Sequence, residues 1–231
     1  MRYLRFKIFE KYKRELKCGL STRHGGVSVG CFESLNLGIG VSIGDTEDNL
    51  AENYKRFCEA VGVDENKIVL AVQEHTDQIF CVKEAGDYGW QKPVSGVDGF
   101  TTNMRGVPLM VRFADCQGVF MFDPAQRVVA AVHSGWRGNV QNIIGKSVRK
   151  MIDEFGCKPE NILVGISPAI GPCCAEFNLW QCSLDQLTEA GVFPQNIEIM
   201  QRCTSCESKD FFSYRRDKGK TGRMGGVIEL M

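Results

Sequence analysis

Histidine is scarce in this sequence, and neither sign of charge is in excess. The chain has 231 residues with 3 histidines, and its 28 basic residues balance its 28 acidic residues, which gives a formal net charge of +0. Without a basic excess, the composition argues against electrostatic binding of nucleic acid. With so few histidines, the chain also lacks the ligands for a site that holds several copper ions.

Long apolar runs are missing as well. No segment has the length of a membrane-spanning helix, and the first residues alternate charged and apolar side chains where a signal peptide has an apolar core. We therefore expect a cytoplasmic protein without a membrane partner, whose 11 cysteines are mostly free thiols. Because no linker or repeat interrupts the chain, we expect a single domain over residues 1–231.

Apolar periodicity predicts strands and helices along the whole chain. Alternation predicts an edge strand over residues 2–9, and further strands are expected near residues 16–22, 68–72, 79–82, 107–113, 162–166, 197 and 227–230. Helical periodicity predicts helices over residues 45–61, 139–155 and 179–190. Asp45 is expected to be the N-cap of the first helix, and Gly62 its stop.

The stretch from Ala114 to Gly138 carries the strongest chemical signal. Two apolar runs joined by the turn Asp123-Pro124 predict a β-hairpin. Cys116 stands at the head of the first strand and His133 at the tail of the second, so we expect the hairpin to bring their side chains together. Such a pair is either a nucleophile with its base or part of a metal site, although most cysteines are simply small buried hydrophobes. His75 also follows an apolar run, where α/β architectures place functional residues.

A helix start next to Arg137 and Gly138 suggests an anion site. Free backbone N–H groups, the helix dipole and the Arg137 guanidinium together favour a bound anion at the start of the helix predicted over residues 139–155. The alternative is that Arg137 pairs with a carboxylate and that Gly138 only relieves backbone crowding. The sequence does not separate these two interpretations.

Four cysteines late in the chain resemble an incomplete metal motif. Cys203-Thr204-Ser205-Cys206 is half of a zinc ribbon without the other half. Cys173 and Cys174 are adjacent, which is poorly suited to joint coordination. We therefore expect buried thiols at these positions.

Taken together, the motifs resemble the laccase-domain family, long labelled polyphenol oxidase and associated with purine nucleoside phosphorylase activity. They span nearly the whole chain in the order of the family: Thr22-Arg23-His24-Gly25-Gly26-Val27-Ser28, Ser34-Leu35-Asn36-Leu37-Gly38, Gln73-Glu74-His75, Asp98-Gly99, Ala114-Asp115-Cys116, His133-Ser134-Gly135-Trp136-Arg137-Gly138, Gly171-Pro172-Cys173-Cys174, Phe212-Ser213-Tyr214-Arg215-Arg216-Asp217 and Thr221-Gly222-Arg223-Met224.

The resemblance implies a fold and a metal site. The expected fold is α+β, a single domain with mixed β-sheets and flanking helices that is similar to cysteine-hydrolase-like folds. The expected metal is Zn²⁺, with Cu²⁺ as the other candidate, held by His75, Cys116 and His133. Two histidines and one cysteine leave a fourth position open, which is the form of a catalytic zinc site.

The resemblance also implies two reactions. In the first, phosphate attacks C1′ of adenosine, inosine, guanosine or methylthioadenosine and yields the purine base and ribose 1-phosphate. The second is deamination of adenosine, for which Asp115 is the candidate acid and base beside the metal ligands. The candidate substrate-binding residues are Arg23, Asn36, Arg137 and Gly138.

Small departures from the family pattern and three other functions have to be weighed. Glu74 and Thr76 replace the family's usual Val and Gly on either side of His75, Ser134 replaces Ala, and Ala175 stands where an aromatic residue is common. None of these changes removes a ligand, but Glu74 and Ala175 affect the expected substrate preference. The alternatives are a Cys/His hydrolase acting on an amide, a copper-dependent polyphenol oxidase, and a binding module that keeps only the fold.

Overall fold

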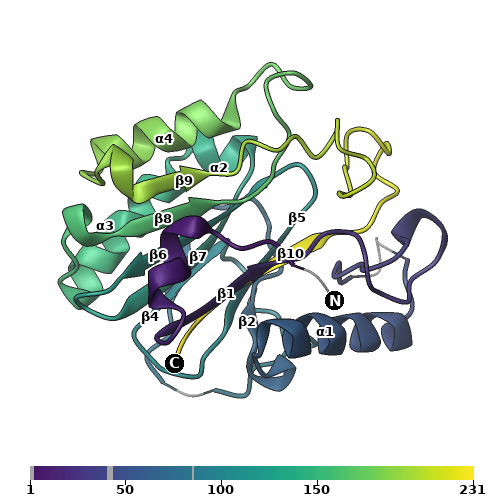
Figure 1. Cartoon of the computed structure of the whole chain (residues 1–231), viewed down its shortest axis with the longest axis horizontal. Coiled ribbons are helices and arrows are strands. Elements are labelled where there is room, and N and C mark those ends of the chain that lie inside the picture. Colours follow the sequence, from purple (N-terminus) through teal and green to yellow (C-terminus); the bar gives the residue numbers. More distant parts are fainter. Residues whose placement is uncertain (1–2, 41–43, 85) are drawn as a thin grey trace.

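Two β-sheets stacked face to face form the centre of the molecule (Figure 1). The computed structural model describes residues 3–40, 44–84 and 86–231. The first sheet has the order β1 (Leu16–Leu20), β10 (Met224–Leu230), β5 (Leu109–Phe113) and β2 (Val69–Leu70). The second has the order β3 (Ile79–Cys81), β4 (Gly99–Thr102), β7 (Val128–Ser134), β6 (Gln117–Asp123), β8 (Leu163–Ile166) and β9 (Ile197–Ile199). Both sheets combine parallel and antiparallel pairs, so the expected α+β fold with mixed sheets is confirmed.

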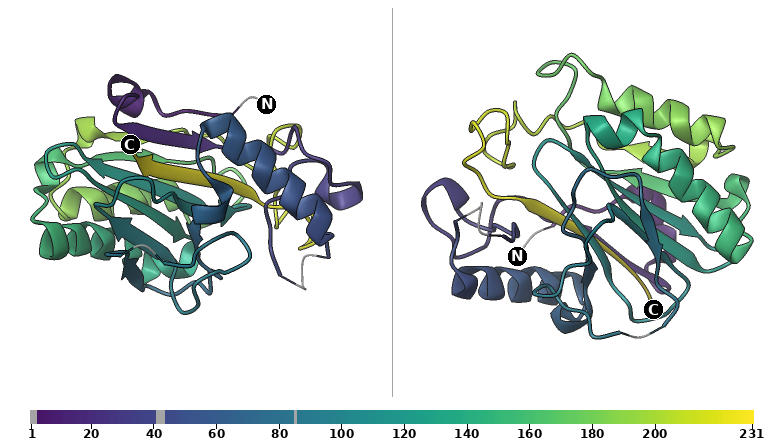
Figure 2. Two further views of the ribbon diagram at one scale, coloured as in Figure 1. Left: turned by 90° about the horizontal axis from the view of Figure 1, so that it is seen from below. Right: turned by 180° about the vertical axis from the view of Figure 1, so that it is seen from behind.

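Helices cover the two outer faces of the stacked sheets. Helix α1 (Glu47–Val61) packs against the first sheet, whereas α2 (Trp136–Val140), α3 (Ile143–Phe155) and α4 (Leu179–Glu189) lie on the side of the second sheet. Figure 2 shows α1 and this second group at opposite sides of the molecule. Short 3₁₀ turns complete the structure at Lys7–Tyr12, Gly30–Phe32, Glu65–Lys67, Pro159–Asn161 and Pro194–Asn196. Among the described residues, no helix combines the length and apolarity needed to cross a membrane.

The central strands are buried on both faces. In β6, Phe120 and Phe122 point into the core between the sheets, while Val119 and Met121 belong to the core beneath α3. A strand that contacts apolar layers on both sides needs no polar face, so its sequence is a continuous apolar run. These two cores hold the β6–β7 hairpin in place, and with it the residues at the end of the hairpin.

The predicted helix over residues 45–61 is confirmed with its start shifted. The N-cap of α1 is Thr46, whose hydroxyl accepts a hydrogen bond from Asn49 N at 3.2 Å. Asp45 instead accepts hydrogen bonds from Ser28 Oγ at 2.6 Å and from Asn36 Nδ2 at 2.9 Å, which ties two loops to the helix start. Gly62 ends the helix in the left-handed conformation at φ 86°, as expected from its type.

The edge strand predicted over residues 2–9 is wrong; Arg2 lies outside the described residues. Only an isolated bridge between Leu4 and Leu20 is formed, and the chain then turns into the 3₁₀ helix Lys7–Tyr12. Phe6 and Phe9 are both buried in the core with ring centroids 5.6 Å apart. Residues three apart share one side of a helical turn but not of a strand, so burying both rings favours the turn.

The single helix predicted over residues 139–155 is in fact two helices. α2 ends at Val140, and Asn142 adopts a left-handed conformation at φ 58° before α3 begins. The Asn142 side chain then caps α3 by accepting a hydrogen bond from Gly145 N at 3.2 Å. Asn tolerates both roles better than most residues, and this explains the break.

Candidate active site

The β6–β7 hairpin brings Cys116 and His133 together. Gly118 pairs with His133 and Gln117 with Ser134, so Cys116, one residue before β6, lies opposite Gly135. A Cβ atom on Gly135 would be only 2.5 Å from Cys116 Sγ, so no other residue type fits there without displacing the thiol. The predicted hairpin and the proximity of its two end residues are confirmed.

His75 reaches the same place from a strained loop after β2. Gln73 and His75 both have positive φ, at 66° and 61°. The Gln73 side chain exchanges two hydrogen bonds with the main chain of Arg112, donating to its O at 2.6 Å and accepting from its N at 2.8 Å. These two hydrogen bonds hold the loop in place, although non-glycine residues such as Gln73 and His75 rarely adopt a positive φ. The ring of His75 lies edge-to-face to that of His133, with centroids 5.0 Å apart.

His75, Cys116 and His133 form a cluster that fits a metal ion. Their ligand atoms all lie within 4.8 Å of one another, and Cys116 Sγ is 3.8 Å from His75 Nε2. Imidazole nitrogen and thiolate sulfur are the donors that zinc prefers, and three protein ligands leave one position for a substrate. The geometry therefore accommodates the metal site expected from the sequence.

Asp98, which sequence reasoning did not single out, fixes both histidines. Its Oδ1 is 2.8 Å from Nδ1 of His133, which leaves Nε2 of that ring free for a metal. Its Oδ2 accepts from Glu74 N at 3.1 Å, Thr76 N at 2.7 Å and Thr76 Oγ1 at 3.0 Å, on either side of His75. The only signal in the sequence was the motif Asp98-Gly99, which carries no chemistry by itself.

The two departures from the family pattern beside His75 have structural roles. The Thr76 hydroxyl binds Asp98, and the Glu74 carboxylate accepts a hydrogen bond from Gly96 N at 2.8 Å. Both contacts tie the His75 loop to the segment that carries Asp98. They therefore support the position of His75 through residues that the family pattern does not use.

The charges in this cluster stabilise one another. Burial opposes ionisation of Cys116, but the charge and hydrogen bonding of His133, with a smaller contribution from His75, lower the pKa of the thiol to about 6. Burial also opposes the charged form of His133, but the Cys116 thiolate and Asp98 raise its pKa to about 9. Without a metal, the favoured state is therefore a thiolate beside an imidazolium.

A cavity of about 850 Å³ opens above the cluster. Besides the three candidate ligands and Asp115, it is lined by apolar and aromatic side chains, by three arginines, and by the polar Gln73 and the acidic Glu176: Ile39, Val72, Phe113, Ala114, Trp136, Ile170, Ala175, Phe177, Leu179, Tyr214, Arg112, Arg215, Arg223, Gln73 and Glu176. A volume of this order holds a small-molecule substrate. Its lining offers flat apolar surfaces together with three arginines and two carboxylates.

The arginines of this cavity have no carboxylate partner among the described residues. Arg112 is buried and donates through Nη2 to Ala71 O at 2.6 Å, but its Nε has no hydrogen-bond partner within the described part of the chain. Burial lowers the pKa of both Arg112 and Arg223. The charge of Arg223 lowers the pKa of Arg112 further, whereas the nearby Cys116 and Asp115 act in the opposite direction on Arg223. A buried cation such as Arg112 is costly unless it is paired, so a bound anion would stabilise this wall.

Asp115, adjacent to Cys116, is held by the C-terminal segment. It has a positive φ of 91°, and its carboxylate accepts from Thr204 Oγ1 at 2.7 Å and from Arg215 N at 2.7 Å. Asp115 lines the cavity, so the structure brings this candidate acid and base together with the three ligands.

The predicted substrate-binding residues lie elsewhere. Arg23 donates to Glu33 O and Ser208 O and stacks on the Phe212 ring, and it does not line the cavity. Arg137 is exposed on α2 beside the buried Gly138. Asn36 is buried, and its Oδ1 accepts from Arg223 N at 2.9 Å, so it positions a residue that does line the cavity. Sequence reasoning missed Arg112, Arg215 and Arg223 because they come from distant segments.

Comparison with known proteins identifies the relatives of this chain. The family model described as multi-copper polyphenol oxidoreductase laccase matches residues 17–178 and 175–231. The chain is 36% identical to the purine nucleoside phosphorylase YlmD of Geobacillus stearothermophilus, over 91% of this chain and 88% of that protein. It is 35% identical to the purine nucleoside phosphorylase YfiH of Shigella flexneri, over 91% of this chain and 92% of that protein.

A solved structure has the same fold. The crystal structure of YlmD from Geobacillus stearothermophilus superposes with a TM-score of 0.91 at 32% identity and covers 100% of this chain and 96% of that one. The arrangement of sheets and helices described above is therefore shared over the whole chain.

Replacing Asp98 tests whether its carboxylate orients His133 for metal binding. We expect Asp98→Asn to weaken zinc binding by about 10- to 100-fold, because the amide supports the required tautomer of His133 less well than the carboxylate does. Competition with a chromophoric chelator measures the affinity. Asp87→Asn, on the surface with a side chain 85% exposed, is the matched control. Equal affinities in both variants would show that Asp98 does not orient the ligand.

The pH dependence of Cys116 reactivity follows from its lowered pKa. In metal-free protein, Cys116 is a thiolate above pH about 6, so its rate of alkylation should rise through pH 6 and then level off. Peptide mass spectrometry separates it from the other cysteines. A rate still rising between pH 8 and 9, where an ordinary thiol titrates at about 8.5, would contradict the ion pair with His133.

Proposed function

This chain belongs to the multi-copper polyphenol oxidoreductase laccase family, and we propose that it is a purine nucleoside phosphorylase. It cleaves a nucleoside with phosphate into the free purine and ribose 1-phosphate. The observation that carries the proposal is a cavity that combines a His/Cys cluster suited to a metal, aromatic surfaces, and arginines that have no carboxylate partner in the described part of the chain. Phosphate, ribose and purine each find a matching surface there.

The metal in this proposal is zinc, held by His75, Cys116 and His133. When bound, zinc supplies a Lewis acid that stabilises negative charge on oxygen atoms of the reacting groups. Asp98 keeps Nε2 of His133 directed at the metal, and Gly135 leaves space for the sulfur of Cys116. The ligand atoms of the three residues already lie within 4.8 Å of one another.

The arginines form the phosphate seat in this proposal. Arg112 and Arg223 hold positive charge in the cavity wall without a carboxylate partner among the described residues, and Arg215 extends from the same wall. Guanidinium groups bind phosphate oxygens through paired, charge-assisted hydrogen bonds. Phosphate held here is oriented for attack on C1′ as the bond from C1′ to the purine breaks. Arg137 with Gly138 remains the alternative seat, as does Arg23.

The apolar side of the cavity receives the purine. Trp136 and Tyr214 line the cavity and expose 57% and 55% of their surface, so both rings are accessible to a ligand. Phe177 lies in the same lining. Flat rings suit stacking on a base and do not discriminate strongly between bases, in keeping with the proposed range of adenosine, inosine, guanosine and methylthioadenosine.

Deamination of adenosine is the second activity in the proposal. Water adds to C6 of the purine and ammonia leaves, which requires a group that moves a proton between them. Asp115 is the candidate because its carboxylate lies beside Cys116 in the cavity wall. Its hydrogen bonds to Thr204 and to the main chain of Arg215 fix its orientation.

One specific observation favours a hydrolase as the second candidate function. Cys116, His133 and Asp98 have the order of a Cys-His-Asp catalytic triad, with His133 Nδ1 bound to the carboxylate. A hydrolase would need Cys116 free to attack an amide. The copper oxidase alternative is weaker, because His24, the third histidine, is exposed and 3.4 Å from Asp210 rather than near the cluster.

Phosphate dependence tests the main proposal. We expect zinc-loaded protein to release hypoxanthine from inosine only when phosphate is present, with one ribose 1-phosphate formed per base, and to form inosine from adenosine without phosphate. Chromatography of all products from one reaction measures both activities. Base release that is independent of phosphate would contradict phosphorolysis, and rapid alkylation of Cys116 in the zinc-loaded protein would favour the hydrolase.

Paired arginine variants locate the phosphate seat. Arg215→Ala removes an exposed side chain but keeps the backbone N–H that binds Asp115. Because a charged hydrogen bond contributes about 1.5–3 kcal/mol, kcat/KM for phosphate should fall by about 10- to 100-fold while deamination is retained. Arg137→Ala is the matched comparison. A loss confined to Arg137→Ala would instead assign the seat to the start of α2.

A further inference from the structure

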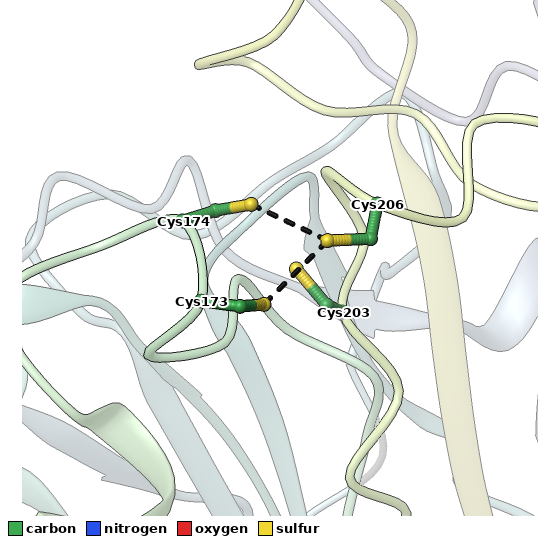
Figure 3. Close-up of side chains that lie close together, drawn as sticks. All are labelled: Cys173, Cys174, Cys203 and Cys206. Atoms are coloured by element: carbon green, nitrogen blue, oxygen red, sulfur yellow. Dashed lines mark hydrogen bonds between the residues drawn. The ribbon is translucent and has the colours of Figure 1, made fainter.

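A second cluster of metal-binding side chains lies outside the candidate active site. The sulfur atoms of Cys173, Cys174, Cys203 and Cys206 all lie within 4.8 Å of one another. Figure 3 shows the four side chains pointing toward a common centre from two segments that are far apart in the sequence. Cys206 Sγ is 3.5 Å from Cys173 Sγ and 3.4 Å from Cys174 Sγ. None of these residues has a part in the proposed reaction.

The backbone explains why these cysteines converge. Ala169 and Cys203 form a parallel bridge, with Ala169 N donating to Arg202 O at 3.2 Å and Thr204 N to Ala169 O at 3.1 Å. Beyond it, a tight turn closed by Cys174 N to Gly171 O at 2.9 Å curls the two adjacent cysteines toward the other segment. Cys173 and Cys174 thus supply the second pair of cysteines, with Cys174 lying 29 residues before Cys203 in the sequence.

The expectation that these thiols are buried is confirmed for Cys203 and wrong for the other three. Cys173 and Cys206 are exposed and Cys174 is partly exposed, whereas Cys203 is buried. Apolar packing therefore does not account for the position of the exposed thiols. The adjacent pair also does not prevent convergence, because the turn directs both sulfurs to the same side of the loop.

We propose that Cys173, Cys174, Cys203 and Cys206 bind a zinc ion as a closed tetrathiolate site. Zinc–sulfur bonds of about 2.3 Å in a tetrahedron place the sulfurs about 3.8 Å apart, close to the separations found here. Gly171 N donates a hydrogen bond to Cys203 Sγ at 3.3 Å, the kind of outer contact that supports a metal thiolate. Four protein ligands leave no position for a substrate, so this site is structural.

The four-cysteine site joins two segments that both lead into the wall of the cavity. The segment with Cys173 and Cys174 continues into Ala175 and Phe177 of the cavity wall, and the segment with Cys203 and Cys206 leads to Tyr214 and Arg215 of the same wall. Both segments also hold Asp115: Ile170 N donates to its O at 2.8 Å, and Thr204 Oγ1 to its carboxylate at 2.7 Å. A zinc ion bound by these four cysteines would therefore cross-link two segments that shape the cavity.

A pair of disulfides is the competing outcome. The closest sulfur separations exceed the disulfide length of about 2.05 Å, and two bonds would fix the same segments without a metal. Disulfides would lower the mass of the intact protein by two hydrogens each, and their cysteines would not react with a thiol reagent after chelation.

Counting zinc in variants tests the proposal. We expect Cys206→Ser to lose one zinc per chain relative to the wild type, and to unfold at a lower temperature. The matched control, Cys31→Ser, changes another exposed cysteine and should keep the wild-type zinc content. His75→Ala should lose a different zinc, so the double variant shows both losses added. The difference in zinc content between Cys206→Ser and wild type tests the four-cysteine site independently of the metal bound at His75. Unchanged zinc content in Cys206→Ser would overturn the proposal.

Labelling of the wild type keeps the test independent of any folding defect in the variants. In native protein, Cys173 and Cys206 should resist alkylation until a chelator removes the metal, whereas Cys31, which is also exposed, should react at once. Peptide mass spectrometry assigns each site. Reaction of Cys173 and Cys206 as fast as Cys31 before chelation, or their failure to react after it, would overturn the proposal.

Discussion

The buried carboxylate of Asp98 is the contact on which the candidate active site depends. One of its oxygens fixes the ring of His133, and the other gathers the hydroxyl and two backbone N–H groups of the loop that carries His75. The side chain is fully buried, so its charge is stable only because each oxygen accepts strong hydrogen bonds. A single residue therefore aligns two candidate ligands, one in a loop and one on a strand, that are 58 positions apart in the sequence.

Around this contact, the hydrophobic architecture supplies rigidity. β6 and β7 are packed between two apolar cores, so the hairpin end that carries Cys116 and His133 has little freedom. The His75 loop is not held by apolar packing in this way and relies on the Gln73 amide and on Asp98 instead. Apolar packing holds the β6–β7 hairpin, and hydrogen bonds hold the His75 loop. Together they produce a cluster whose geometry suits a metal ion.

Local patterns predicted the parts of the site that lie close together in the sequence. The hairpin follows from two apolar runs and a turn, and it places Cys116 beside His133 through antiparallel register alone. Helix stops such as Gly62 were predictable for the same reason, since they depend on one residue's backbone preference. The break at Asn142 was not, because it depends on which of two compatible roles the residue adopts in the folded chain. The arginines of the cavity and the four-cysteine cluster were beyond sequence reasoning, because each assembles segments that only the tertiary fold brings together.

The position of β10 in the first sheet affects how the protein folds during its synthesis. This strand lies between β1 and β5, and it pairs residues near 16–20 with residues near 226–230. Until β10 is synthesised, β1 and β5 have no common partner, and each presents an open edge to other chains. Pairing across such a sequence separation is entropically costly and slow. During translation, the nascent chain thus holds a nearly complete second sheet beside an unfinished first one, and chaperone demand should concentrate in that interval.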